Sequence, residues 1–365
     1  MRTQGADLAG VAALSLIVTV VLAAPVLLEP STRVFGAELV GRHHDPFTVM
    51  QQFGSPLITG VYAQPVTEMV GVLLARVVGP VAAYNGLVLL SFPLAAMAGF
   101  LLARHLHLAP VTSALVALAF AFSPFHLAHA AYHPHIAQVQ WIPLYLLALW
   151  RSLDKASPGR LVVLALALVA VVWSNFYGGL IAGVITPFAI VGYWWCRLRP
   201  QADAGWQVVR TVATLAVLTC GGMAYVWWTA PALWTAPNAF AFPRADLFAY
   251  SAKWWSYAVP PLNNSWWGDV AQGIWIAWEV DAGVLEQQVS VGLGVIALGV
   301  VAVASVWSRT ASAPTRRIVP LLVLLAGVAL VCSLSPERTI EGLRMVRPSA
   351  LFYEVVPMIR AYARF

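Results

Sequence analysis

Three histidines between residues 125 and 136 have a spacing that could hold a metal ion. His126, His129 and His133 stand at positions i, i+3 and i+7, so a helix through them would place all three on one face. Zinc accepts three imidazole ligands, although no cysteine and no His-Glu-x-x-His pattern accompanies these residues. The histidines are therefore candidate ligands of a divalent metal such as zinc, or else a polar seam packed beneath a loop.

Residues 41–47 offer a carboxylate with cationic and titratable neighbours. Asp45 follows Arg42, His43 and His44 directly in this segment. A carboxylate held near a membrane surface by such neighbours can accept the proton of a hydroxyl group as that hydroxyl attacks. Asp45 is thus a candidate general base. The alternative is that Asp45 and the following Pro46 open a turn or cap a helix.

The carboxyl-terminal segment carries four arginines that could bind phosphate: Arg344, Arg347, Arg360 and Arg364. A guanidinium group can hold two phosphate oxygens at once, and a lipid-phosphate substrate presents its phosphate at the membrane surface. Contact with anionic lipid headgroups is an equally simple interpretation. In either case we expect this segment to face phosphate groups.

The elements that must position these groups are membrane helices. Of the 365 residues, 60% are hydrophobic and 10% are charged, whereas a soluble domain carries roughly 25% charged residues. Apolar runs of about 20 residues, enough to cross a hydrocarbon core, recur along the chain. We therefore predict an all-α polytopic transmembrane bundle of about nine spans. The predicted spans are residues 8–28, 80–104, 108–124, 137–151, 160–176, 178–197, 208–229, 288–307 and 317–334.

Basic residues between the spans predict the orientation of the chain in the lipid bilayer. Four short connections and their flanks contain many arginines, with only Asp154 and Asp203 against them. By the positive-inside rule these connections and the amino terminus are cytoplasmic. The net charge of +6 therefore reflects membrane topology, and we expect no nucleic-acid partner. The connections are residues 105–107, 152–159, 198–207 and 308–316.

Long loops on the opposite face are the expected location of the chemistry. Residues 29–79 and 230–287 would be outer loops of a single transmembrane domain that covers residues 1–365. Residues 246–259 interleave aromatic and polar side chains, which is typical of an amphipathic helix lying in a membrane surface. The predicted spans carry almost no charged residues away from their ends, and this disfavours an ion-coupled transporter.

Several motifs resemble the GT-C superfamily of polytopic glycosyltransferases. After a first helix and a long loop with an acidic residue come Asn85-Gly-Leu-Val-Leu-Leu, then Ala103-Arg104, then Ala119-Phe-Ala-Phe-Ser-Pro124. Later in the chain stand Ala245-Asp-Leu-Phe-Ala-Tyr250 and Arg360-Ala-Tyr-Ala-Arg364-Phe365. Within the superfamily, the chain is most similar to bacterial YfhO-like and dolichyl-phosphate-mannose-type mannosyltransferase-like membrane proteins.

This resemblance implies a membrane glycosyltransferase of cell-envelope glycan or glycolipid assembly. It would transfer a sugar from a polyprenyl-phosphate donor to a glycan or lipid acceptor at the outer face of a bacterial inner membrane. Asp45 takes the place of the family's acidic first-loop residue and would be the base. Relatives continue with further helices after the last motif, so the chain could be truncated at its carboxyl terminus. The residues expected to contact the substrate are His43, His44, His129, His133, Arg347, Arg360 and Arg364.

Two other functions are compatible with the same residues. A transporter or flippase for a lipid-linked glycan would use the same outer surface without bond chemistry. A non-catalytic envelope-assembly protein would bind lipid or partner chains there. Replacing Asp45 by asparagine separates these functions from an enzyme, because the substitution should abolish sugar transfer while leaving binding or flipping mostly intact.

Overall fold

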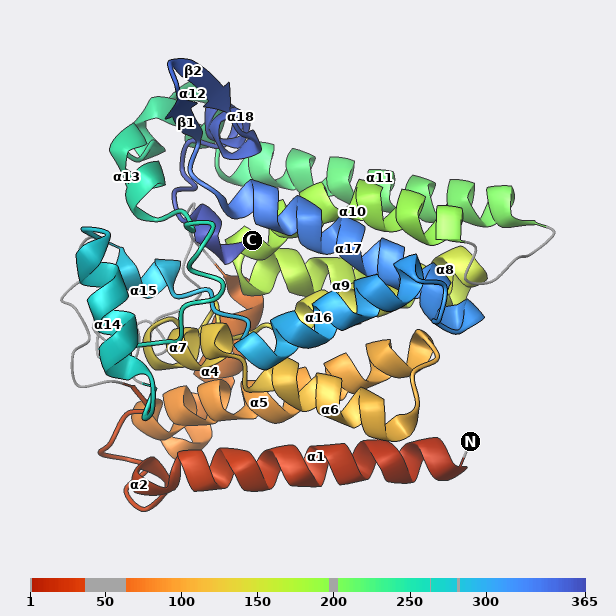
Figure 1. Cartoon of the computed structure of the whole chain (residues 1–365), viewed down its shortest axis with the longest axis horizontal. Helices are drawn as coiled ribbons and strands as arrows, with labels where there is room; N and C mark the ends of the chain where they lie inside the picture. Colours follow the sequence, from red (N-terminus) through yellow and green to blue (C-terminus); the bar gives the residue numbers. More distant parts are fainter. Residues whose placement is uncertain (1, 37–63, 197–202, 263, 281–282) are drawn as a thin grey trace. The chain divides into compact units, whose positions relative to one another are not determined.

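The computed structural model describes residues 2–36, 64–196, 203–262, 264–280 and 283–365. The described chain is mostly helical, with one two-stranded hairpin (Figure 1). Its contacts group into two compact units, which are described separately below. The expected single domain over residues 1–365 stays a prediction. Unit 1 takes in residues 1–183 and 199–219, and unit 2 takes in residues 184–198 and 220–365.

Many helices of unit 1 begin with proline. This residue suits the first helical position, because its fixed φ is already helical and the amide hydrogen that it lacks would have no partner there. Unit 1 contains α1 (Arg2–Leu22), α2 (Ala24–Leu27), α4 (Pro65–Val78), α5 (Pro80–His105), α6 (Pro110–Ala121), α7 (Pro124–Tyr132), α8 (Trp141–Asp154), α9 (Pro158–Ser174) and the first parts of α10 (Phe176–Cys196) and α11 (Ala204–Thr229).

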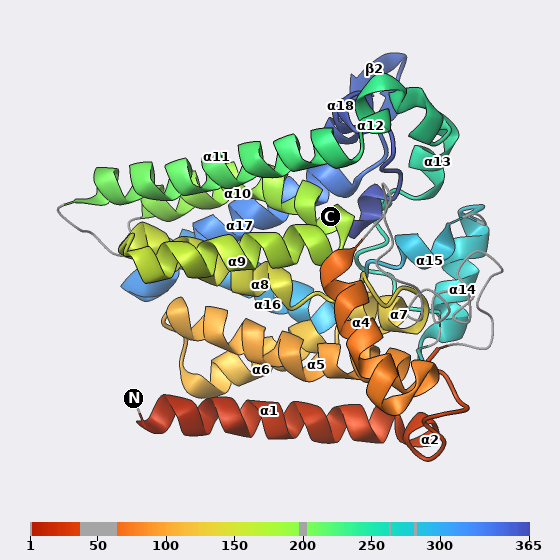
Figure 2. The ribbon, with the colours of Figure 1, turned by 180° about the vertical axis from the view of Figure 1, so that it is seen from behind.

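Helix α5 is the central helix of unit 1 and packs against α1, α4, α6 and α8 (Figures 1 and 2). Its buried side chains include Tyr84, Phe92 and Phe100. At Gly99, a β-carbon would lie 3.4 Å from the backbone of Ala117 in α6, so a small residue is needed where the two helices meet. Small residues at such crossings are typical of helices packed within a membrane, because they let the backbones approach closely.

Asn85, near the start of α5, holds the backbone of the segment that follows α2. Its Oδ1 accepts a hydrogen bond of 2.9 Å from the Phe35 amide, and its Nδ2 donates to the carbonyls of Pro30 (3.0 Å) and Arg33 (2.7 Å). The side chain is buried. One asparagine therefore satisfies three backbone groups that lie 50 to 55 positions earlier in the chain. This gives a structural reason for the first residue of the Asn85-Gly-Leu motif.

We expect Asn85→Asp to destabilise the protein more than Asn85→Ala. Alanine loses three hydrogen bonds, at about 1 kcal/mol each. Aspartate keeps the bond from Phe35 but turns a carboxylate oxygen toward two carbonyl oxygens, which adds repulsion to the loss of two donors. The measurement is the thermal midpoint in detergent, together with the rate of trypsin cleavage after Arg33, which should rise in both variants. An Asn85→Asp protein as stable as the wild type would contradict this role.

Unit 2 contains the remaining helices and the hairpin. Strands β1 (Glu337–Ile340) and β2 (Leu343–Val346) pair antiparallel through a turn in which Glu341 and Gly342 have φ values of +50° and +82°. Two positive φ angles are typical of a two-residue hairpin turn, and this hairpin corrects the expectation of an all-α chain. The other elements of unit 2 are the second parts of α10 and α11, α12 (Ala232–Thr235), η1 (Pro237–Phe240), α13 (Arg244–Ala249), α14 (Gly268–Ala277), α15 (Val284–Gln287), α16 (Leu293–Trp307), α17 (Ala313–Ser333), α18 (Pro348–Val355) and η2 (Tyr362–Arg364).

Among the described residues, six helices are long and apolar enough to cross a membrane. Three predicted spans form shorter helices, namely α8, α9 and α16, so the count of nine is not confirmed. In the first of these, Gln138 bonds to the Pro134 carbonyl at 3.0 Å, and the chain turns there before α8 begins at Trp141. The six helices are Gly5–Leu22, Pro80–His105, Pro110–Tyr132 (α6 and α7 taken together), Tyr177–Cys196, Ala204–Thr229 and Ala313–Ser333.

The predicted surface helix over residues 246–259 is wrong beyond its first turn. Helix α13 ends at Ala249, and turns follow. The Ala252 amide donates to the Ser333 carbonyl at 2.9 Å, and the Ser256 hydroxyl donates to the Lys253 carbonyl at 2.8 Å. A serine side chain that bonds to nearby backbone in this way competes with the helical hydrogen-bond pattern.

Candidate functional site

The predicted base and its neighbours lie outside the described residues. Asp45, His43 and His44 fall within residues 37–63, so their assignment as base and substrate ligands stays a prediction. The described residues hold the other candidates, which are the histidines around α7 in unit 1 and the arginines of unit 2.

His126 is held by contacts of its own within unit 1. Ser123 caps α7 by accepting a hydrogen bond from the His126 amide. The imidazole Nδ1 lies 2.6 Å from the Ala121 carbonyl oxygen, and Nε2 lies 2.9 Å from the Ser91 hydroxyl. The ring also stacks on Phe92, with centroids 4.3 Å apart. Nδ1 must donate to the carbonyl, so in a neutral ring Nε2 can only accept, and the Ser91 hydroxyl lies within reach of both Nε2 (2.9 Å) and the Val88 carbonyl oxygen (2.6 Å).

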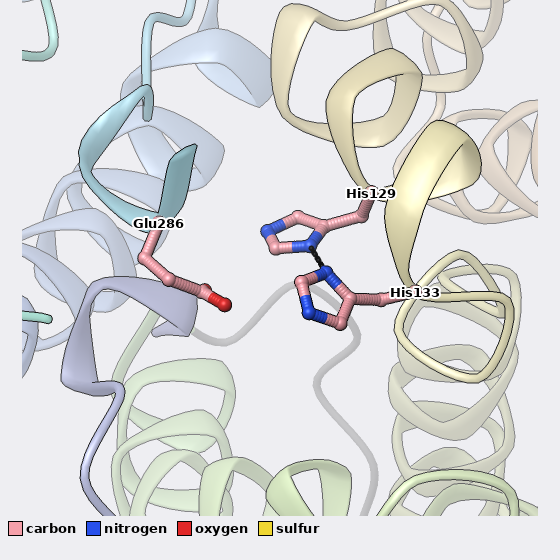
Figure 3. Close-up of side chains that lie close together, drawn as sticks. All are labelled: His129, His133 and Glu286. Carbon is pink, nitrogen blue, oxygen red and sulfur yellow. Dashed lines mark hydrogen bonds between the residues drawn. The ribbon is translucent and has the colours of Figure 1, made fainter. Parts of the chain in front are cut away.

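His129 and His133 form a close pair. Their Nδ1 atoms lie 3.1 Å apart and face one another, as Figure 3 shows, and each residue is 1% exposed. His133 follows the last residue of α7 with φ −135° and ψ 83°, so it is no longer helical. The structure thus brings together two of the three predicted metal ligands and holds His126 in separate contacts.

The His129 and His133 rings can either share a hydrogen bond or act together as metal ligands. Without a metal, one Nδ1 donates a proton to the other, so the two rings share a hydrogen bond. With a tetrahedral zinc ion bound at 2.0–2.1 Å, two ligand nitrogens would lie roughly 3.3 Å apart, which is close to the observed spacing. Binding of a divalent metal by His126, His129 and His133 stays a prediction, and any metal held by the Nδ1 atoms would involve His129 and His133.

Glu68 is a carboxylate that the sequence interpretation missed. It lies in the first turn of α4, where its Oε1 accepts a hydrogen bond of 3.1 Å from the Gln64 amide. Among the described contacts, its buried Oε2 has no hydrogen-bond partner. Burial raises the pKa of Glu68, and the bond from Gln64 opposes that rise. Pro65 followed by a glutamate in the first turn is a helix-start signature that could have revealed α4.

We expect Glu68→Gln to stabilise the protein at neutral pH and to have no such effect in acid. The folded state raises the pKa of this carboxyl above 4.5, so it binds the proton more tightly than the unfolded chain does. Wild-type stability therefore falls as pH rises through the folded pKa, and glutamine removes that dependence while it keeps the bond from Gln64. Thermal midpoints across this pH range test the expectation. Glu29→Gln, at an exposed carboxylate, is the control, and equal pH profiles for wild type and Glu68→Gln would contradict it.

In unit 2, three segments distant in sequence meet around α13. Asp246 of α13 accepts a hydrogen bond of 2.7 Å from Arg360, and Gln287 of α15 donates to the Ala249 carbonyl at 2.6 Å. Arg364 of η2 donates to both carboxylate oxygens of Glu286, with the bond from Nε at 2.8 Å. We call these five residues the polar junction: Asp246, Glu286, Gln287, Arg360 and Arg364. It joins α13, α15 and η2, two of which carry the Ala245–Tyr250 and Arg360–Phe365 motifs.

Arg360 is further enclosed by aromatic rings. Its guanidinium carbon lies 4.3 Å from the Phe242 ring centroid and 4.6 Å from that of Tyr250. The Ala363 amide also donates to the Tyr250 carbonyl at 3.1 Å. A guanidinium between two rings and beside a carboxylate has a fixed position, because cation–π attraction and the ion pair act together.

The predicted phosphate-binding arginines have different partners. Arg360 and Arg364 are paired with the carboxylates of the polar junction, and Arg344 pairs with Glu337. Arg347 instead donates to the Ser335 hydroxyl at 2.9 Å and to the Ser335 carbonyl at 3.3 Å. Among the described residues, no carboxylate forms an ion pair with Arg347. Burial lowers the pKa of Arg347, and repulsion by Arg338 lowers it further.

The partners in the polar junction could not be found from sequence. Asp246, Glu286 and Gln287 were not among the predicted site residues. Glu286 and Gln287 lie in the short helix α15, within the stretch 230–287 that the sequence analysis interprets as a loop, and no spacing rule connects them to residues 360–364.

A family model described as a domain of unknown function, DUF6311, matches residues 40–365. No curated protein matches the chain. No solved structure matches it either.

Proposed function

We propose that this chain, which belongs to the DUF6311 family, is a membrane glycosyltransferase that uses a polyprenyl-phosphate sugar donor. The sugar would pass to a glycan or lipid acceptor at the outer face of a bacterial inner membrane, in cell-envelope assembly. The amino terminus would be cytoplasmic, as the basic connections between spans predict. The apolar helices support a location in the lipid bilayer, and a polyprenyl-phosphate donor lies in that bilayer.

The observation that best supports a phosphate-bearing substrate is the environment of Arg347. Its guanidinium is partly buried, is repelled by Arg338 and has a serine rather than a carboxylate as its partner. A phosphate bound there would relieve the repulsion and accept bidentate hydrogen bonds. Arg344, Arg360 and Arg364 are already paired, so a phosphate could reach them only by competing with a carboxylate. Of the predicted donor ligands, Arg347 is therefore the strongest.

The proposed reaction is a displacement at the anomeric carbon of the donor sugar. Asp45 takes the proton of the acceptor hydroxyl as the hydroxyl oxygen forms a bond to the anomeric carbon. The bond between the carbon and the phosphate oxygen breaks, and the electron pair leaves with the polyprenyl phosphate. Arg347 stabilises the charge on the departing phosphate. His43, His44, His129 and His133 would position the sugars, and a divalent metal could bind at His129 and His133.

The decisive experiment measures sugar transfer by reconstituted protein. Vesicles containing the purified protein receive polyprenyl-phosphate mannose or glucose with a radiolabelled sugar, together with an envelope lipid extract as acceptor. We expect Asp45→Asn to lower the transfer rate by about 10²- to 10⁴-fold, because a general base contributes that much. Arg347→Gln should also lower it, whereas Arg344→Gln, which removes an exposed paired arginine, should have little effect.

Two results would overturn the proposal. If the wild type moves labelled donor across the bilayer without transferring sugar, and Asp45→Asn does the same, the protein is a flippase. If a cysteine placed at Gln51 reacts with a membrane-impermeant maleimide only from the cytoplasmic side, the first loop faces the wrong compartment for this reaction.

A further inference from the structure

A cavity in unit 1 lies at the end of its helices that the arginine distribution predicts to be cytoplasmic. It has a volume of about 400 Å³ and lies where α5 and α8 end and α9 begins. Arg104, Arg151 and Arg160 line it, together with His105 and Asp154. The lining thus carries three guanidinium groups against one carboxylate, and it is distinct from the outer residues discussed above.

Asp154 and His105 form a buried pair in the lining of this cavity. The Asp154 Oδ2 lies 3.7 Å from the His105 Nε2, and the two side chains are 3% and 4% exposed. The Asp154 carboxylate can offset only part of the positive charge of the three arginines. Arg104 and Arg160 are partly buried and Arg151 is exposed, and positive charge gathered around one cavity attracts an anion.

Two of the arginines each donate one hydrogen bond to a backbone carbonyl, which holds them in place. Arg160 donates through Nη1 to the Arg151 carbonyl at 2.8 Å, and Arg104 donates through Nη1 to the Leu108 carbonyl. Each guanidinium has five N–H groups, so one such bond leaves others for a ligand. The buried Nε of Arg104 has no hydrogen-bond partner among the described contacts. A buried donor without a partner costs free energy, and a bound anion would supply the missing acceptor.

We propose that this cavity binds a phosphate group, held by Arg104, Arg151 and Arg160. Planar guanidinium groups match phosphate oxygens in pairs, and three of them around one cavity make an anion site of defined geometry. The phosphate could belong to an anionic lipid headgroup or to a free phosphate ion. Both present the same oxygens, so the experiment must separate these sources.

The test uses the full chain in nanodiscs with two probes. Radiolabelled inorganic phosphate is measured by equilibrium dialysis in phosphatidylcholine discs, and phosphatidylglycerol retention is measured by native mass spectrometry in mixed discs. Arg104→Gln with Arg160→Gln should weaken the probe that binds by about tenfold or more, because a hydrogen bond to a charged group contributes roughly that factor. Lys155→Gln is the matched control, because it removes an exposed charge from the same connection without lining the cavity.

For a second variant we expect tighter binding of the probe, an effect that a purely structural role of the arginines would not produce. Asp154→Asn removes the negative charge from the lining, so it should tighten binding of the same probe by about threefold. Should the double glutamine variant not fold, Arg104→Lys with Arg160→Lys replaces it, since lysine keeps the charge but loses the paired geometry and should weaken binding. Failure of both probes to bind the wild type overturns the proposal. An equal loss in Lys155→Gln overturns it too, because binding would then reflect general surface charge.

Discussion

Glu286→Gln should lower the free energy of unfolding by about 3 to 5 kcal/mol, the usual cost of removing one partner from a buried ion pair. The Glu286 and Arg364 side chains are each 8% exposed, and the guanidinium donates to both carboxylate oxygens. Glutamine keeps the shape of glutamate but removes the negative charge that accepts two hydrogen bonds from the buried Arg364 guanidinium. The measurement is the denaturant-induced unfolding of the purified protein in detergent micelles.

Two further variants separate the buried pair from charge removal in general. Glu354→Gln breaks the 3.6 Å ion pair with Arg244, in which the Glu354 and Arg244 side chains are 67% and 45% exposed. We therefore expect it to lower the free energy of unfolding by less than about 1 kcal/mol. Glu286→Gln combined with Arg364→Gln should lose less than Glu286→Gln alone, because no charge is left unbalanced. If Glu286→Gln and Glu354→Gln lower stability equally, the pair does not hold α15 against η2.

Gly283→Ala should destabilise the protein by about 3 kcal/mol or more, because a left-handed conformation and a steric overlap add together. Gly283 has φ of +74° and immediately precedes α15. A β-carbon at this position would overlap the carbonyl oxygen of Ala249, which also accepts the bond from Gln287. Relief of the overlap would move α15 away from α13 and would therefore also weaken the contact of Glu286 with Arg364.

Gly342→Ala is the matched control for this expectation. Gly342 has φ of +82° in the two-residue hairpin turn, but a β-carbon there would meet nothing within 4 Å. Alanine at Gly342 should therefore cost only the left-handed conformation, about 1 to 2 kcal/mol. Similar losses in the two variants would show that the close approach of Gly283 to Ala249 is not needed for stability. Chemical unfolding monitored by tryptophan fluorescence gives both values on one scale.

On these expectations, the polar junction stabilises unit 2 by holding three segments together. It joins residues 244–250, 284–287 and 360–364 through ion pairs, a hydrogen bond from the Gln287 side-chain amide and a cation–π contact. On the proposed function, the junction would steady the unit that carries Arg347, the proposed phosphate ligand. Loss of the junction should then reduce the proposed sugar transfer as well as stability, and a transfer assay on Glu286→Gln at low temperature would register that effect.

The helices and their membrane environment could be predicted from the sequence because they depend on local properties. Apolar length, proline at the first helical position and charged residues between the spans all lie within short windows of the chain. Every predicted span has a helix in the structure, and six helices among the described residues are long enough to cross a membrane. The errors lie where side chains bond to backbone, as at Ser256, or where a short turn with positive φ forms a hairpin, as at Glu341 and Gly342.

The contacts of the charged residues depended on the tertiary structure. Arg360 and Asp246 are separated by 114 positions and Arg364 and Glu286 by 78, and no periodicity links residues at such distances. The sequence named the arginines as phosphate ligands because guanidinium favours phosphate, but it could not show which of them already hold a carboxylate. It likewise placed three histidines on one face, and only packing decided that His126 bonds to Ser91 while His129 and His133 face each other. Composition and local pattern set the elements, whereas long-range pairing sets the chemistry available to each side chain.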